Sequence, residues 1–138
     1  MSCIFCKIIN RELPSYTIFE DELFVAFLDI SPASDGHVLI VPKRHIQDIY
    51  GLTEEESAAL MPLAQKIAGK INSTLSPDGL NILQNNGKAA GQDVFHYHLH
   101  VIPRYSGDAA SARHPFFPRT SASQEELGKL AEKLMISC

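Results

Sequence analysis

Apolar residues come in short runs along most of the chain, separated by turn residues. Such runs, rich in valine, isoleucine and phenylalanine, predict β-strands. They cover residues 16–19, 23–28, 37–41 and 80–84, and a fifth run follows the glycine-containing loop 85–92. Short connections between consecutive strands favour an antiparallel sheet.

Three other segments show the spacing of helices. Residues 3–10 place isoleucines and a phenylalanine on one helical face. Thr53 and Glu56 form a capping box before an apolar stripe that continues to Leu75, and Ser123 with Glu126 repeats that signature before a last helix. The pattern predicts an α+β domain with a five-stranded antiparallel sheet. A short N-terminal helix, a long middle helix and a C-terminal helix would pack on one face of it.

Three histidines alternate with apolar or aromatic residues in the fifth run: His96, His98 and His100. In a strand these three share one face, roughly 6.6 Å apart. A histidine-rich surface strand is the plain alternative, but the strict alternation against an apolar face argues against it. A row of imidazoles suits metal binding or attack on a phosphorus centre.

Composition narrows the class of protein. The chain has 138 residues, 45% of them hydrophobic, and a formal net charge of −4, which predicts one domain with a core of its own. No basic run is longer than Lys43-Arg44, which argues against duplex nucleic acid as a partner. We also expect no membrane span and no secretory signal. The odd number of cysteines is most simply explained by a reduced, cytoplasmic setting.

Cys3 and Cys6 form a Cys-x-x-Cys pair near the N-terminus. The pair could bind a metal, act as a redox couple, or be two cysteines that meet by chance. Redox couples usually follow a strand in a βαβ unit, which the pattern does not predict here. The residues alone leave these alternatives open.

Several motifs together resemble the histidine triad (HIT) superfamily, and most closely its bacterial Hit branch. The motifs are Cys3-Ile-Phe-Cys-Lys-Ile-Ile9, Phe27-Leu-Asp-Ile-Ser-Pro32, Gly36-His37-Val-Leu-Ile-Val-Pro42, Gly91-Gln92, His96-Tyr-His-Leu-His-Val101 and Pro103-Arg104. The resemblance implies a single HIT domain over residues 1–138, with a core at 3–104 and a C-terminal extension with a helix at 105–138. It also implies a homodimer in which the two sheets continue across a two-fold axis.

The resemblance also assigns the chemistry. His98 would be the nucleophile that attacks the α-phosphorus of a purine nucleotide and forms a covalent nucleotidyl-histidine, which water then hydrolyses. His100 would hold a phosphate oxygen, and His37 would lie near the leaving group. The implied substrates are phosphoramidates, acyl phosphates and dinucleoside polyphosphates. The rival interpretation is a zinc-stabilised nucleotide-binding adaptor or sensor with incidental catalysis.

The resemblance further implies a nucleotide pocket and a metal site. Asp29 would accept hydrogen bonds from the ribose hydroxyls, and the base would lie between Phe5, Phe27 and Ile30. The phosphate side would be formed by Asn85, Gly91, Gln92 and Asp93, together with His98 and His100. Structural zinc would be held by Cys3, Cys6, His45 and His96, a closed tetrahedral donor set.

Asp93 departs from the pattern of the family, in which serine or threonine is usual at this position. An ionised carboxylate cannot donate a hydrogen bond to phosphate. We therefore expect Asp93 to turn away from the ligand, towards Lys88 or Arg104.

Overall fold

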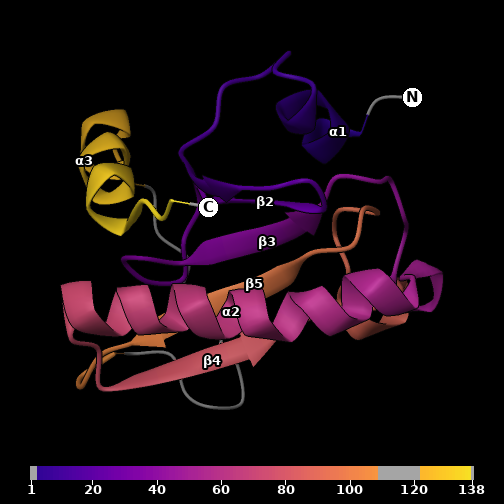
Figure 1. Cartoon of the computed structure of the whole chain (residues 1–138). Helices are drawn as coiled ribbons and strands as arrows, with labels where there is room; N and C mark the ends of the chain where they lie inside the picture. The colour runs from indigo at the N-terminus through magenta and orange to yellow at the C-terminus, as the bar shows by residue number, and fades with distance from the viewer. Residues whose placement is uncertain (1–2, 109–121, 138) are drawn as a thin grey trace.

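The computed structural model describes residues 3–108 and 122–137. Five strands form one antiparallel sheet in the order β1-β2-β3-β5-β4 (Figure 1). The strands are β1 (Thr17–Glu20), β2 (Phe24–Leu28), β3 (Val38–Pro42), β4 (Gly79–Leu83) and β5 (Leu99–Arg104). The helices are α1 (Ile4–Ile9), α2 (Glu54–Leu75) and α3 (Gln124–Leu134), and two 3₁₀ turns cover Ile49–Gly51 and Lys88–Ala90. The predicted α+β class and five-stranded antiparallel sheet are confirmed.

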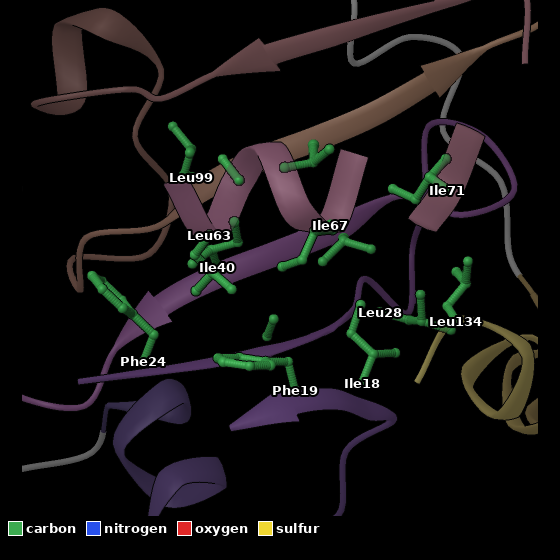
Figure 2. Close-up of a cluster of buried hydrophobic side chains, with 14 of the residues drawn as sticks. Ile18, Phe19, Phe24, Leu28, Ile40, Leu63, Ile67, Ile71, Leu99 and Leu134 are labelled. Atoms are coloured by element: carbon green, nitrogen blue, oxygen red, sulfur yellow. The ribbon is translucent and has the colours of Figure 1, made fainter. Parts of the chain in front are cut away.

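The capping signatures begin two of these helices as predicted. Thr53 and Glu56 make both hydrogen bonds of a capping box at the start of α2, and Ser123 caps α3. The buried stripe of α2 packs on the sheet in one large apolar cluster, to which α3 also contributes. Figure 2 shows Leu63, Ile67 and Ile71 of α2 in this cluster, with Leu134 close to Leu28 and Ile18.

The prediction that all helices share one face of the sheet is wrong for α1. Alternate residues of a strand point to opposite faces, and in β2 both sets are buried. Phe24, Ala26 and Leu28 belong to the cluster with α2 and α3, whereas Val25 and Phe27 pack with Phe5 of α1 in a second cluster. Continuous apolar runs such as β2 and β3 therefore reflect a sheet that is covered on both faces.

The strand of the histidine run is shorter than predicted, because β5 begins only at Leu99. Before it, the backbone N–H of Tyr97 donates to the carbonyl of Ile46 (2.7 Å), and the carbonyl of Pro42 accepts from the His96 ring (2.8 Å). These contacts replace the next rungs of the ladder with β3. The alternation still holds, since Tyr97, Leu99 and Val101 lie in the α2 cluster. The imidazoles of His98 and His100 are consequently directed to the α1 face.

Within the described residues, no helix is long and apolar enough to cross a membrane.

Candidate functional site

Two of the three alternating histidines form the centre of the site, and the third is directed elsewhere. The rings of His98 and His100 are neighbours, with centroids 4.9 Å apart. The ring of His96 instead lies against His45, at 4.8 Å. Phe5 of α1 lies between the two groups, with its ring 5.1 Å from His98 and 5.9 Å from His96. The run thus supplies two separate sites rather than one row.

The tautomer of His98 follows from one hydrogen bond. Its Nδ1 lies 2.8 Å from the backbone carbonyl of His96, which can only accept. Nδ1 therefore carries the proton, and Nε2 presents its lone pair. The side chain is 5% exposed, so the ring is held in place while its Nε2 edge can still be reached. This is the arrangement that a nucleophilic imidazole requires.

A second chain of hydrogen bonds fixes His37 and His100. The backbone N–H of Ala33 donates to Nδ1 of His37 (3.0 Å), so the His37 proton lies on Nε2. That Nε2–H points to Nδ1 of His100 at 2.9 Å, which places the His100 proton on its own Nε2. Both rings are almost fully buried. His100 is thereby prepared as an N–H donor beside His98.

The same chain argues against a metal at Asp29, His37 and His100, whose donor atoms lie within 4.8 Å of one another. A metal on Nε2 of His37 would displace its proton while Nδ1 still accepts from Ala33. The ring would then have to be an imidazolate, a far less accessible form than the neutral imidazole that metals normally bind. We interpret the group as a hydrogen-bonded relay.

Asp29 and its neighbours form the edge of the site. One carboxylate oxygen of Asp29 accepts from the N–H of Ser31 (2.9 Å), and the other lies 3.7 Å from Nε2 of His37. Phe5 and Phe27 are buried with edge-to-face rings 5.6 Å apart. Ile30, by contrast, is 64% exposed beside Asp29. The structure thus brings the predicted ribose and base residues to the end of β2.

The loop between β4 and β5 is fixed by the side chain of Gln92, which is 4% exposed. Its Oε1 accepts from Gly87 N (2.7 Å), and its Nε2 donates to the carbonyls of Gln47 (2.7 Å) and Val94 (3.1 Å). These bonds use the amide within the protein, so Gln92 positions the loop. Gly91 adopts φ +92°, a left-handed conformation that favours glycine, and its Cα lies close to the Asn85 side chain.

Asp93 does not turn towards Lys88 or Arg104, so that expectation is wrong for this structure. Its Oδ1 lies 3.8 Å from Nε2 of His98, and the side chain is 78% exposed. Arg104 pairs instead with Asp108 at 2.9 Å. The fixed backbone of Gln92 places Asp93 at the mouth of the site, where its carboxylate faces the lone pair of the nucleophile.

Cys3, Cys6, His45 and His96 come together as a compact group, with all donor atoms within 4.8 Å of one another. The sulfur–nitrogen distances are 3.4 Å from Cys3 to His96, 3.3 Å from Cys6 to His45 and 3.6 Å from Cys6 to His96. The two Nδ1 atoms are 3.1 Å apart. Tetrahedral zinc with its usual bond lengths requires edges of about 3.5 Å (S···N) and about 3.3 Å (N···N). The four residues fit such an ion.

The surroundings of His96 prepare it as a ligand. Its Nε2–H donates to the Pro42 carbonyl (2.8 Å), so the lone pair of Nδ1 is directed at the cysteines. Burial lowers the pKa of His96, with a further contribution from neighbouring His45, which favours the neutral form that metals bind. Burial and the adjacent Cys3 raise the pKa of the Cys6 thiol. A bound cation would reverse that effect and make both thiolates favourable.

Some positioning groups could not be found from the sequence. The carbonyls of Pro42 and His96 and the N–H of Ala33 are backbone atoms with no residue signature. Arg44, next to His45, forms a two-point contact with buried Glu56 at 3.2 and 2.8 Å. The capping box marked Glu56 as a helix start, but nothing in the pattern connected it to Arg44.

Comparison with known proteins agrees with this geometry. The HIT domain model matches residues 10–107. "Protein hit" of Bacillus subtilis is 50% identical over 112 residues, covering 80% of this chain and 77% of that protein. Adenosine 5'-monophosphoramidase hnt1 of Schizosaccharomyces pombe is 38% identical over 135 residues, covering 97% and 96%.

A solved structure, a Zn-bound histidine triad family protein from Mycobacterium smegmatis, superposes with a TM-score of 0.82 at 42% identity, covering 97% of this chain and 94% of that one. The HIT domain match contains His37, His45 and all three alternating histidines. From the domain match, the relatives and the shared fold, the chain belongs to the histidine triad (HIT) family.

Proposed function

We propose that this protein hydrolyses purine nucleotide derivatives at the α-phosphate through a covalent intermediate on His98. The observation that carries the proposal is the hydrogen bond from Nδ1–H of His98 to the His96 carbonyl, which leaves Nε2 as the nucleophilic atom. The curated relatives named adenosine 5'-monophosphoramidase support an adenosine phosphoramidate as substrate. We extend the substrate class to acyl phosphates and dinucleoside polyphosphates, since all present a leaving group on an α-phosphorus.

The first step forms the bond between Nε2 of His98 and the α-phosphorus. The bond to the leaving group breaks, and the leaving group takes the electron pair and a proton from water. The ring keeps its Nδ1 proton and becomes positively charged, so the His96 carbonyl stabilises the intermediate. The His100 Nε2–H, set by His37, would donate to a phosphate oxygen as charge develops there.

The second step returns the enzyme to its starting state. Water attacks the α-phosphorus of the nucleotidyl-His98, the P–N bond breaks, and its electron pair returns to Nε2. A nucleoside monophosphate leaves with the water oxygen, and the proton released from water goes to solvent. His37 then resets the tautomer of His100 through its own fixed proton.

The nucleotide would lie with its ribose at Asp29 and its base against Ile30, Phe5 and Phe27. A carboxylate can accept hydrogen bonds from two adjacent hydroxyls, and an exposed isoleucine beside it offers an apolar surface for a base. Asn85 and the loop at Gly91 would face the phosphates. These placements follow from the distances among the protein groups.

The metal that we propose is structural zinc at Cys3, Cys6, His45 and His96. Four protein ligands close the coordination sphere, so the ion would fix α1 against the sheet and take no part in the reaction. Cysteines that bind a metal as thiolates suit a reducing compartment, and we place the protein in the cytoplasm.

One observation favours a second candidate function, a nucleotide-binding adaptor or sensor with incidental turnover. The Asp93 carboxylate, 3.8 Å from the nucleophilic nitrogen, would repel an incoming phosphate and slow the chemical step. Binding through Asp29 and the apolar residues would be less affected.

Intact-protein mass spectrometry after rapid mixing with an adenosine phosphoramidate separates the two. A hydrolase should show a transient nucleotidyl adduct on His98 that decays as nucleoside monophosphate accumulates. The His98→Ala variant should form no adduct and lose roughly 10³- to 10⁶-fold in kcat, while it still binds the nucleotide. Near-normal turnover by His98→Ala would refute the mechanism, and absence of any adduct in the wild type would favour the adaptor.

A further inference from the structure

Asp93 is held firmly although its side chain is exposed. The preceding Gln92 is buried and makes three hydrogen bonds within the protein, and the following Val94 packs against the cluster around Phe5. The backbone of Asp93 is therefore anchored on both sides. Its carboxylate has little freedom except to turn about its own bonds near Nε2 of His98, 3.8 Å away.

The charge around this carboxylate is uncompensated by the protein. Among the described residues, no lysine or arginine forms an ion pair with Asp93. The fixed tautomers make His37 a neutral neighbour, and the other acid at the site, Asp29, is also negative. A bound phosphate would add further negative charge. The balancing positive charge must then come from outside the chain.

We propose that Asp93 selects the leaving group by its charge, and that the preferred substrates carry a cationic amine close to the scissile bond. This inference rests on the proposed function. The nucleotide part is common to all substrates, so its repulsion by Asp93 lowers every rate alike. Only the leaving group varies, and it departs from the phosphorus within a few ångströms of the carboxylate. An ammonium group there is attracted, whereas a carboxylate or a polyphosphate is repelled.

Three adenosine 5'-phosphoramidates of nearly equal size test this directly. Their amines carry a 2-aminoethyl, a propyl or a 2-carboxyethyl group, so that the leaving group is cationic, neutral or anionic. With the full-length, metal-loaded protein at low salt, kcat/KM should fall in that order. Because water screens an exposed carboxylate, we expect roughly 3- to 10-fold per unit of charge.

The Asp93→Asn variant keeps the shape of the side chain and removes its charge. It should bring the three kcat/KM values together, with the largest gain for the anionic compound. Glu132→Gln removes one negative charge from an exposed position of α3, on the opposite face of the sheet, and should leave the order unchanged. An equal dependence on charge in wild type and Asp93→Asn, or no dependence in either, would overturn the proposal.

Added Mg²⁺ and a non-reacting variant distinguish direct selection by Asp93 from a bridging metal ion and from an effect on the chemical step. If the preference among the compounds appears only when Mg²⁺ is added, a metal ion bridges Asp93 and the phosphate, and the proposal is wrong. Calorimetric Kd values on His98→Ala, which cannot react, should follow the same order of charge. That order would support the selection by Asp93 even if no nucleotidyl adduct ever forms, and its loss with a normal adduct would overturn the selection alone.

Discussion

Replacing Cys3 by serine should remove the metal while keeping the local backbone intact. The Cys3 sulfur accepts from the Cys6 N–H (3.4 Å) as the N-cap of α1. Serine is among the best N-cap residues, so Cys3→Ser preserves the cap and removes only the thiolate. The variant therefore isolates the contribution of the ion from that of helix capping.

The expected effect is large because α1 has little stability of its own. It contains six residues, too few for a helix that persists without tertiary contacts. Binding of an ion present at about 1,000 times its Kd stabilises the folded state by about 4 kcal/mol. For a chain of this size, about 3 °C of Tm corresponds to each kcal/mol, so the melting temperature should fall by roughly 12 °C.

Scanning calorimetry with and without a chelator measures this effect, and metal analysis should find one equivalent of zinc in the wild type and none in Cys3→Ser. The chelator should lower the Tm of the wild type and leave the variant unchanged. Since Phe5 contacts His98, nucleotide binding should weaken, but turnover should fall less than in His98→Ala. A chelator effect of equal size in both proteins, or in neither, would refute the metal site. Oxidised Cys3 and Cys6 in a metal-free protein would support a redox pair instead.

Three further predictions concern stability and assembly. The hydrogen bond from Arg44 lowers the pKa of Glu56 below its ordinary value of 4.5, so the wild type should be more stable than Glu56→Gln above about pH 4.5. Urea unfolding should show that this difference disappears as the pH falls through the Glu56 pKa, and a constant difference would contradict it. Tyr97 is buried with no hydrogen-bond partner for its hydroxyl among the described residues, so Tyr97→Phe should raise the unfolding free energy by about 1 kcal/mol, whereas Tyr97→Ala should lower it by about 3–5 kcal/mol. A loss of stability in Tyr97→Phe would reveal a hidden partner for the hydroxyl. We also predict a homodimer joined through the edge strand β4, where Ile82 is 40% exposed, so light scattering should find a dimer at micromolar concentration that Ile82→Lys converts to a monomer. A monomeric wild type would exclude it.

The sequence determined the elements and most of the chemistry. The strands and helices could be predicted within a few residues, because apolar periodicity and helix caps act over distances of a few residues along the chain. The alternating histidines, Asp29 and the Cys-x-x-Cys pair were recognisable for the same reason. Each is a local pattern whose residue types already specify donors, acceptors or nucleophiles.

Only the tertiary structure decided how these groups are divided and what each one faces. His96 and His98 look equivalent in the sequence, yet one ring joins the metal ligands and the other faces the phosphate side, because different backbone carbonyls accept from them. The side of the sheet taken by α1 and the approach of Asp93 to His98 were both predicted incorrectly. Such outcomes depend on contacts between residues far apart in the chain and on backbone atoms that every residue shares. No local pattern of side chains records them.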